Sequence, residues 1–457
     1  VYKMSYLNYK KYYFIGIGGI GMSAVAEYIH SIGKNVSGYD RDNSLITKRL
    51  IKLGIDISHK DDTEIIDFDL VNNSNTLVVH TPAISNKNCI LNYFKKNNYN
   101  VVKRSDLLAE IVNSKFCIAI AGTHGKTTTT SILAHIMYSA GLNFTSFVGG
   151  VLKDYETNII LNGDEIFVVE ADEYDKTFLK LHPNVASIMN IDGDHYDIYS
   201  DFNDLKKSFK KFSDNLKKDG ILFHDSNLDF NGFSFGLNSD SDAQLINIKN
   251  VSGKLTFDIK INEKIYKDII FNMLGTHNAL NALVAFIIAL NLNINIDTIL
   301  KALKSFPGIK RRFSLELIKP KVFIDDYAHH PSEILSVYNS ISKLYPGLKN
   351  LVIFQPHLFS RTKDFLIDFA KALEKFDKIV LLDIYPAREE PIDGISSKSI
   401  YDIIENENKS IIKKSEIPEL LKSDSSDLIV TMGAGDIGDE VELIKKTLAE
   451  NLWKWKF

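Results

Sequence analysis

A short segment that contains two glycines, Gly122-Thr123-His124-Gly125-Lys126-Thr127-Thr128, carries the strongest chemical signal in the chain. An apolar run at 116–121 precedes it and a helical pattern follows over 126–140. The backbone N–H groups of such a turn and the start of the helix bind an anion well. Lys126 is then placed to reach the β- and γ-phosphates of a nucleotide, and the Thr127 hydroxyl to bind Mg²⁺. Ile120 stands where the full pattern has its first glycine, so a chance Lys-Thr pair at a helix start is the alternative.

Acidic residues follow two further apolar strands of the predicted sheet. Glu170 ends the run 167–170, and ligands gather at the carboxyl ends of parallel strands. Its carboxylate is therefore a candidate ligand for Mg²⁺. His195 ends the segment 190–195 and is a candidate for a second metal, although a lone histidine is more often structural. We interpret Asp172 and Glu173 as part of a solvated loop.

A second glycine motif lies near the N-terminus, where Gly16, Gly18 and Gly21 follow a strand and open a helix, with Asp40 after the next strand. This is the pattern of dinucleotide-binding sites. It suits any diphosphate-containing nucleotide, so the pattern alone does not separate a nicotinamide cofactor from a nucleotide sugar. Of the two glycine loops, only the one at 122–128 has a Lys-Thr pair and acidic residues downstream. We therefore expect one site to use a nucleoside triphosphate and the other to hold a substrate that carries a diphosphate.

Arginine and histidine cluster in the last third of the chain, at or just after apolar strands. The clusters are Arg311-Arg312, the segment 325–331 (DDYAHHP) and the segment 355–362 (QPHLFSRT). Guanidinium groups bind carboxylate or phosphate oxygens with two parallel hydrogen bonds. Polar loops and a helix cap are the plainer interpretation, but the density of these residues at strand ends favours a site.

Strands alternate with helices along most of the chain, which predicts an α/β fold with parallel sheets. At about 150 residues per domain, 457 residues correspond to three domains. The pattern changes over 220–272 to short strands with Asn, Asp and Gly turns, which indicates a small antiparallel insertion. The helix expected over 277–292 closes the middle part, and strand and helix alternate again after 307.

The composition excludes several classes of protein. Lys plus Arg total 54 and Asp plus Glu total 58, so the net charge of −4 argues against a nucleic-acid partner. No apolar run is long enough to span a membrane, and no signal peptide is evident before the first motif. The two cysteines, Cys89 and Cys117, require no oxidising compartment. We expect a cytoplasmic protein with no membrane partner, present as a monomer or a weak homodimer.

The motifs taken together resemble those of the Mur ligases of peptidoglycan synthesis, and most closely the members that add L-alanine. The resemblance rests on nine segments in family order: GIGGIGMS at 16–23, AGTHGKTTTTS at 121–131, VVEADEYDKTFL at 168–179, NIDGDHYDIY at 190–199, LGTHNALNALVA at 274–285, GIKRRF at 308–313, DDYAHHPSE at 325–333, FQPHLFSRT at 354–362 and GAGDIG at 433–438. They span nearly the whole chain, and their joint occurrence is far more specific than any single motif.

This resemblance implies three domains and a reaction. Residues 1–112 would form a Rossmann-like domain for the UDP-sugar, 113–307 a central P-loop domain for ATP, and 308–457 a Rossmann-like domain for the amino acid. The implied reaction joins L-alanine to the carboxylate of UDP-N-acetylmuramate, with ATP as phosphoryl donor and Mg²⁺ as cofactor.

The resemblance also assigns residues to each ligand. The UDP-sugar would be bound by Gly16, Gly18, Gly19, Gly21 and Asp40. ATP would be bound by Gly122, Thr123, His124, Gly125, Lys126, Thr127, Thr128, Asn278, Asn281, Arg312 and Asp326. The metal would be held by Thr127, Glu170 and His195. The amino acid would be bound by Tyr327, His329 and Arg361.

The chemistry suits these residue types. A carboxylate is a poor electrophile, and transfer of the γ-phosphoryl group makes it an acyl phosphate that an amine can attack. Lys126, Arg312 and Mg²⁺ would offset the repulsion between the two anions. The attacking amine must be neutral, so a base has to accept a proton, and His195 and His329 are both candidates.

Two positions bear on the resemblance. Leu358 stands where many family members have an arginine, which weakens the assignment of the alanine pocket. Several sister ligases carry a carbamylated lysine near the metal. Lys210 lies at a similar distance after His195, but its neighbours Lys206, Lys207 and Lys211 indicate a solvated helix face. We therefore predict no carbamate.

Three other functions remain as alternatives. A recycling ligase of the same superfamily would add a preformed peptide instead of alanine. An NAD-dependent oxidoreductase would use the loop at 16–21 and leave Lys126 without a purpose. A non-catalytic nucleotide switch would bind ATP and form no peptide bond.

Overall fold

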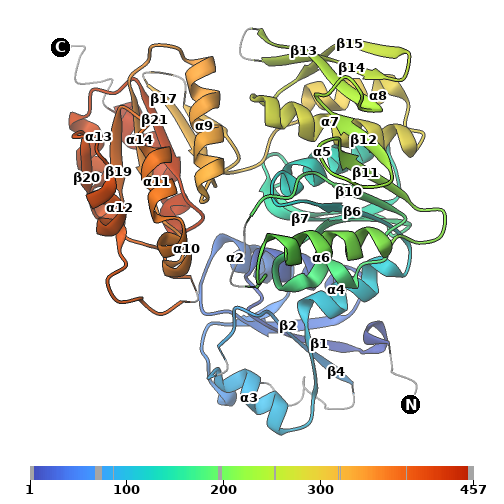
Figure 1. Cartoon of the computed structure of the whole chain (residues 1–457). Helices are drawn as coiled ribbons and strands as arrows, with labels where there is room; N and C mark the ends of the chain where they lie inside the picture. Colours follow the sequence, from blue (N-terminus) through green and yellow to red (C-terminus); the bar gives the residue numbers. More distant parts are fainter. Residues whose placement is uncertain are drawn as a thin grey trace. The chain divides into compact units, whose positions relative to one another are not determined.

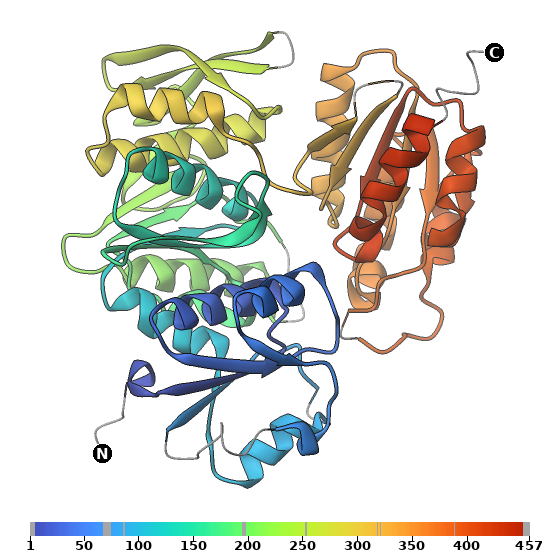
Figure 2. The same cartoon turned by 180° about the vertical axis from the view of Figure 1, so that it is seen from behind.

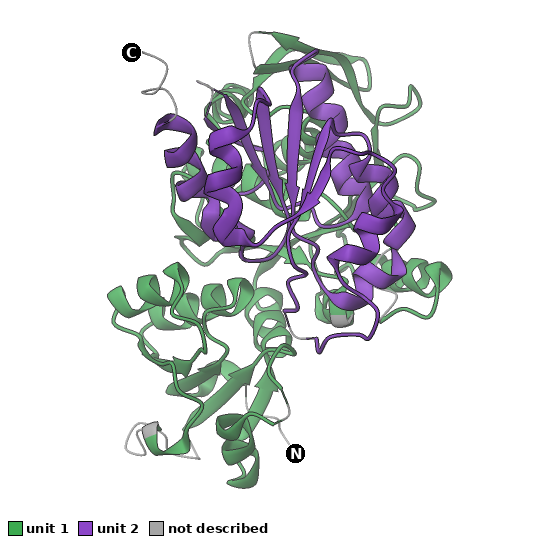
Figure 3. Cartoon of the chain, turned by 90° about the vertical axis from the view of Figure 1, so that its left-hand side faces the viewer, with its two compact units in different colours: residues 1–307 green, residues 308–457 purple. Residues whose placement is uncertain are grey.

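The computed structural model describes residues 5–66, 75–85, 87–193, 198–251, 254–317, 319, 321–387 and 389–450. They fold into two compact units, residues 1–307 and 308–457 (Figures 1 and 3). Unit 1 contains two sheets and unit 2 contains one. Among these residues, no helix is both long and apolar enough to cross a membrane.

The N-terminal part of unit 1 is a parallel sheet in the order β3-β2-β1-β4-β5, as expected for a Rossmann-like domain. Its strands are β1 Lys11–Ile15, β2 Asn35–Tyr39, β3 Asp56–Ser58, β4 Thr76–His80 and β5 Asn100–Lys103. Its helices are α1 Ile20–Ser31, α2 Leu45–Lys52, α3 Cys89–Lys96 and α4 Arg104–Asn113, with short 3₁₀ turns at Tyr6–Asn8 and Thr63–Ile65.

The central part of unit 1 is one ten-stranded mixed sheet, in the order β15-β14-β13-β12-β11-β10-β6-β9-β7-β8. The strands are β6 Phe116–Ala121, β7 Phe144–Leu152, β8 Thr157–Asn162, β9 Ile166–Ala171, β10 Val185–Ile188, β11 Ile221–Asp225, β12 Phe233–Gly236, β13 Ala243–Val251, β14 Lys254–Ile261 and β15 Lys264–Phe271. The helices are α5 Lys126–Ser139, α6 Phe202–Asp214, α7 Thr276–Asn291 and α8 Ile296–Ser305, with the 3₁₀ segment η3 at Tyr174–Lys180.

The antiparallel pairing predicted for 220–272 begins only at β13. Strands β11 and β12 still pair in parallel, and β13, β14 and β15 then continue the same sheet as an antiparallel meander. The hairpin of β7 and β8 is an element that the sequence did not reveal. The chain needs no separate core for the insertion, because β13 extends the edge of the central sheet.

The two sheets of unit 1 share a core. Tyr28 of α1 packs edge-on against Phe147 of β7 and Phe167 of β9, with ring centroids 5.8 and 5.6 Å apart. Polar contacts reinforce this, since Arg49 of α2 donates to Thr157 and Asn158 at the start of β8, at 2.6 and 2.8 Å. In Figure 2 the dark blue helices α1 and α2 lie between the blue sheet and the teal sheet. The nucleotide motifs of both sheets therefore lie in one compact unit.

Unit 2 is a six-stranded sheet in the order β16-β17-β21-β18-β19-β20, parallel except for β16. The strands are β16 Ser314–Leu317, β17 Val322–Asp326, β18 Asn350–Phe354, β19 Lys378–Leu381, β20 Lys409–Ile411 and β21 Leu428–Met432. The helices are α9 Pro331–Leu344, α10 Phe359–Asp364, α11 Leu366–Leu373, α12 Ser397–Ile403, α13 Ile417–Ser423 and α14 Val441–Glu450, with 3₁₀ turns at Lys414–Glu416 and Asp436–Glu440. Helices cover both faces of this sheet (Figure 3).

Candidate active site

The turn between β6 and α5 has the geometry of a phosphate-binding loop. Gly122 and Gly125 have φ angles of +139° and +84°, which side-chain-bearing residues rarely adopt. A Cβ built on Gly125 would lie 2.5 Å from Oδ1 of Asn281. Lys126 begins α5 directly after Gly125, so the free N–H groups of the helix start face the loop. Thr127 and Thr128 are buried in the first turn.

Asn190, just beyond β10, fixes the shape of this loop. Its side-chain oxygen accepts from the backbone N–H of His124 at 2.8 Å, and its amide donates to the His124 carbonyl at 3.0 Å. Nearby, the backbone N–H of Asp192 donates to the Thr123 hydroxyl at 2.9 Å. Sequence reasoning placed Asn190 at a strand end without a role, and only the folded chain shows that it positions the loop.

The Lys126 ammonium lies inside the loop and pairs with Glu173. Its Nζ is 2.8 Å from Glu173 Oε2 and also donates to the Gly122 carbonyl at 2.5 Å. The prediction that Glu173 belongs to a solvated loop is wrong, because only 1% of its side chain is exposed. Tyr199 explains part of this burial, since its hydroxyl donates to the Glu173 carbonyl at 2.6 Å and closes the segment.

Charges around Lys126 shift several pKa values. Burial alone would lower the pKa of Lys126, but the carboxylates of Glu173 and Asp172 outweigh it and raise that pKa above its usual value. Burial, followed by repulsion from Glu173, raises the pKa of Asp172, which was also predicted to be solvated. Lys126 is therefore fully charged and held by acids in the absence of a phosphate.

Two of the three predicted metal ligands lie together. The Thr127 hydroxyl is 3.0 Å from Glu170 Oε2, and the backbone N–H of Gly149 donates to Glu170 Oε1 at 2.5 Å. These hard oxygen atoms beside a phosphate loop are of the kind that Mg²⁺ prefers. His195 lies outside the described residues. Within the described ranges, no group of three or more His, Cys, Asp or Glu side chains has the arrangement of a metal site.

Asn278 and Asn281, predicted to contact adenine, are buried on α7. The Asn278 amide donates to the Leu274 carbonyl at 2.7 Å, and the Asn281 amide donates to Asn278 Oδ1 at 3.2 Å. Asn281 Oδ1 also accepts from the Thr129 hydroxyl at 3.4 Å. Asn281 of α7 therefore packs against the start of α5. Their contact with adenine stays a prediction.

The N-terminal glycine motif forms a turn between β1 and α1. Gly16 has a φ of +84°, and the Gly19 backbone N–H donates to the Gly16 carbonyl at 3.2 Å. Asp40 stabilises the turn, because its Oδ2 accepts from the Gly18 N–H at 2.7 Å while its Oδ1 accepts from Asp42 N–H at 2.9 Å. Gly21 lies in the first turn of α1. Binding of a UDP-sugar by these residues stays a prediction.

In unit 2 the adjacent arginines have different surroundings. The guanidinium of Arg311 donates to the carbonyls of Gly433 and Gly435 and lies 3.3 Å from Asp325 Oδ2, so it holds the loop after β21 in place. Both guanidinium groups lie over the Tyr327 ring, with Cζ 5.3 Å from the ring centroid for Arg311 and 5.1 Å for Arg312. The Arg312 guanidinium makes no hydrogen bond or ion pair with a described residue, so of the two it is the one that fits the predicted phosphate contact, which stays a prediction.

The predicted amino-acid residues lie near one another in unit 2. The Tyr327 and His329 rings are 5.3 Å apart, and His329 Nδ1 is 2.9 Å from the Tyr327 carbonyl, which assigns the proton to Nδ1 and leaves Nε2 as acceptor. Burial lowers the pKa of His329 to about 4, with Glu333 opposing the shift and Arg361 adding to it. His329 is therefore neutral near pH 7.

Asp326 and Leu358 have structural roles that the sequence did not reveal. Both Asp326 oxygens accept backbone N–H groups, from Phe313 at 2.6 Å and from Ala328 at 2.7 Å. Burial raises the pKa of Asp326 to about 6, although Arg312 opposes the shift. Leu358 is buried at a φ of +71° before α10, and its backbone N–H donates to the Tyr385 carbonyl at 3.0 Å.

Lys210 is exposed and pairs with Asp214 at 2.8 Å on the same helix, which agrees with the predicted solvated face.

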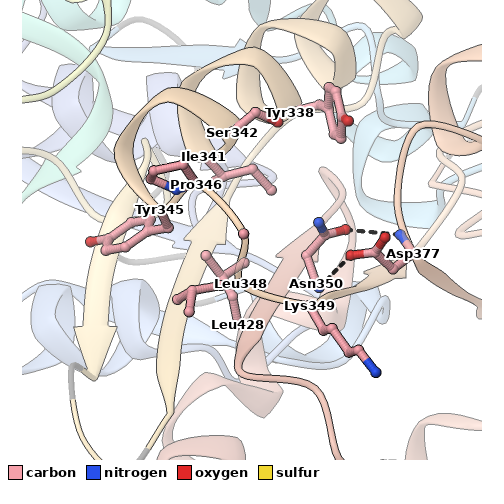
Figure 4. A pocket seen from close by; sticks show the side chains of 11 residues that line it. Tyr338, Ile341, Ser342, Tyr345, Pro346, Leu348, Lys349, Asn350, Asp377 and Leu428 are labelled. Carbon is pink, nitrogen blue, oxygen red and sulfur yellow. Dashed lines mark hydrogen bonds between the residues drawn. The ribbon is translucent and has the colours of Figure 1, made fainter.

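A pocket in unit 2 lies at the amino ends of β18 and β21, where Tyr345, Lys349 and Leu428 are part of its lining (Figure 4). None of the predicted site residues lines it. Asp326 is the last residue of β17, and Tyr327 and His329 follow it at the carboxyl end of that strand.

Comparison with known proteins gives consecutive matches along the chain. Residues 11–116 match the Mur ligase family catalytic domain, 120–289 the Mur ligase middle domain, and 311–435 the Mur ligase glutamate ligase domain. A protein from Christiangramia forsetii named UDP-N-acetylmuramate–L-alanine ligase is 48% identical over 97% of this chain and 99% of its own. The chain belongs to the Mur ligase family. Its three-domain α/β fold and its ligase class are those that the sequence motifs predicted.

Further members of the family agree with this assignment. A protein of the same name from Flavobacterium psychrophilum is 50% identical over 96% of this chain and 98% of its own. A crystal structure of a UDP-N-acetylmuramate-alanine ligase from Thermotoga maritima has a TM-score of 0.81 and 28% identity, and covers 98% of this chain and 100% of the other. The structure of a murein peptide ligase from Psychrobacter arcticus, at a TM-score of 0.70 and 22% identity, shares the fold over 96% of this chain and 98% of the other.

Proposed function

We propose that this Mur ligase joins L-alanine to the carboxylate of UDP-N-acetylmuramate at the expense of ATP, in peptidoglycan synthesis in the cytoplasm. The near full-length similarity to relatives named for that reaction carries the proposal. The loop at 122–128 supports it, because a Lys-Thr pair at a helix start, with Thr127 buried beside Glu170, suits a nucleoside triphosphate.

The first step needs positive charge at the phosphates. Lys126 is charged and held in the loop by its ion pair with Glu173. An incoming γ-phosphate would replace Glu173 as the partner of the Lys126 ammonium. Thr127 and Glu170 would hold Mg²⁺, together with His195, and the ion would neutralise charge on the phosphates. By the family resemblance, Arg312 would add a further guanidinium to the phosphate contacts. Together these groups favour transfer of the phosphoryl group to the substrate carboxylate.

The second step needs an amine, an anion site for its carboxylate and a proton acceptor. Arg361 and Tyr327 would bind the amino acid, and the free Nε2 of His329 would accept the proton. A pKa of about 4 makes His329 a weak base in the free chain. Arrival of an anionic substrate raises that pKa, since nearby negative charge favours the protonated form. His195 stays the second candidate.

The purified chain tests the proposal in a coupled assay with ATP, UDP-N-acetylmuramate and either L-alanine or a murein tripeptide. We expect ADP, phosphate and the alanyl product with L-alanine. Preference for the tripeptide would show a recycling ligase, and ATP binding without product would show a nucleotide switch. Lys126→Ala should lower turnover at least a thousandfold while UDP-sugar binding changes little, because the two loops belong to different sheets.

A further inference from the structure

Arg104, the first residue of α4, lies against the N-terminal glycine motif, although no sequence motif includes it. A Cβ built on Gly21 would be 3.1 Å from its Nη1, 3.2 Å from its Cζ and 3.3 Å from its Nε. The guanidinium therefore occupies the space beside the first turn of α1 that a side chain at position 21 would fill. It is half-buried there.

The charge on Arg104 has no partner in the part of the chain that the structure describes. Its guanidinium makes no hydrogen bond or ion pair with a described residue. Lys103 and Arg104 put two cations at the positive end of the α4 dipole, where Asp106 is the acidic residue of the first turn. A half-buried guanidinium without a partner is costly unless an anion binds to it.

The carboxylates of Asp172 and Glu170, at the end of β9, are the negative charges that act on the Arg104 guanidinium. Burial lowers the pKa of Arg104, and the charges of Asp172 and then Glu170 oppose that shift without forming an ion pair. Asp172 lies beside Glu173, which already binds Lys126. The guanidinium is thus held between the glycine turn of one sheet and the acids of the other.

The glycine turn itself lacks positive charge for a diphosphate. Residues 16–21 contain no Lys or Arg, and the carboxylate of Asp40 already takes the Gly18 N–H. The Gly19 N–H donates to the Gly16 carbonyl. The free N–H groups that remain are those at the start of α1, beside which the guanidinium of Arg104 lies.

We propose that Arg104 binds the diphosphate of the nucleotide-sugar substrate at the start of α1, a role that rests on the proposed function. The planar fork of the guanidinium matches two phosphate oxygens. The helix N–H groups and Arg104 then bind the same diphosphate from two sides. Arg104 is a substrate-binding residue that adds the cation which the glycine turn does not contain.

Calorimetric titration of Arg104→Gln, Arg104→Lys and wild type with UDP-N-acetylmuramate, UDP and uridine tests this role. In Arg104→Gln we expect the affinity for UDP and for UDP-N-acetylmuramate to fall by the same factor, at least about tenfold, with uridine unaffected. Arg104→Lys keeps the charge but not the fork and should lose less. Lys103→Gln, which removes the neighbouring cation at the same helix end, is the matched control and should change either affinity less than about twofold.

Kinetics and stability complete the test. The KM for UDP-N-acetylmuramate should rise in Arg104→Gln, while the KM for ATP, binding of a non-hydrolysable ATP analogue and the melting temperature stay near wild type. Equal UDP affinity in Arg104→Gln and wild type overturns the proposal, as does a loss confined to UDP-N-acetylmuramate, which would place Arg104 on the sugar carboxylate. A wild-type chain that binds UDP but forms no alanyl product would contradict the proposed function and leave the role of Arg104 standing.

Discussion

At the scale of single residues, Lys126 is the cation that the loop at 122–128 holds in place. Its ammonium is bound by Glu173 and by the loop carbonyls of Gly122 and Thr123. An arriving triphosphate carries the same kind of negative oxygen as Glu173. In the proposed reaction a phosphate would take the place of this carboxylate beside Lys126, so we expect loss of the Glu173 charge to have a different cost with and without nucleotide.

Glu173→Gln tests this substitution. Without ligand the variant leaves the buried ammonium with weaker compensation, and we expect it to lose about 2 kcal/mol of unfolding free energy. Saturation with a non-hydrolysable ATP analogue should restore part of that loss, since the phosphate replaces the missing charge. Urea unfolding with and without the analogue measures both values. Asp214→Asn, which breaks the exposed pair with Lys210, is the control and should change neither.

His329 makes the stability of the chain depend on pH. Its pKa is about 4 in the folded chain and about 6.5 in a flexible peptide. Between these values the unfolded chain binds a proton that the folded chain does not, so stability falls as the pH decreases from 6.5 towards 4. The loss from this residue is about 2 kcal/mol between pH 7 and pH 5. Urea unfolding of wild type and His329→Gln at both pH values should show a smaller loss in the variant, and equal losses would contradict the lowered pKa.

At the scale of elements, α5 depends on two glycines that look alike in sequence and differ in surroundings. Gly125 precedes the helix at a φ of +84°, and Gly141 follows it at +69°. A Cβ at Gly125 meets Asn281, whereas a Cβ at Gly141 meets no atom within 4 Å. The first glycine is required by the phosphate loop and by packing against α7, and the second only by the backbone angle.

Gly125→Ala should therefore be far more harmful than Gly141→Ala. We expect Gly141→Ala to cost about 1 kcal/mol, from backbone strain alone, and to bind ATP normally. In Gly125→Ala the backbone strain is joined by a steric clash between the new Cβ and Asn281, so the loop must move. We therefore expect the affinity for an ATP analogue to fall more than tenfold. Thermal melting and titration of the two variants provide the comparison; similar effects of both would show that Asn281 does not brace the loop.

Elements with strong local signals could be predicted from sequence, and contacts between distant elements could not. The apolar run at 116–121, the glycines and the lysine were enough to predict β6, the loop and the start of α5. Glu173 was misinterpreted because its neighbours Asp172 and Tyr174 look like a polar loop, and its partner Lys126 is 47 positions away. Arg104 lies in none of the sequence motifs. Its proposed role depends on its guanidinium lying beside Gly21, which belongs to another helix.

At the scale of the whole molecule, the two units have separate hydrophobic cores. The core of unit 1 joins both of its sheets, with Phe14 and Phe167 among its buried residues. The sheet of unit 2 has a core on each face, one around Phe354 and one around Ile353. Each unit buries enough apolar surface to unfold as a cooperative body of its own.

We therefore expect two unfolding transitions in the full chain, each sensitive to its own core. Ile136→Ala in α5 and Ile353→Ala in β18 each remove a fully buried side chain and should cost about 2–5 kcal/mol. In differential scanning calorimetry each variant should lower the midpoint of one transition and leave the other in place. The transition lowered by Ile136→Ala should be the one that rises with an ATP analogue, since a ligand stabilises the part that binds it through Lys126. If both variants shift one common transition, the units unfold together and the separation of their cores has no thermodynamic consequence.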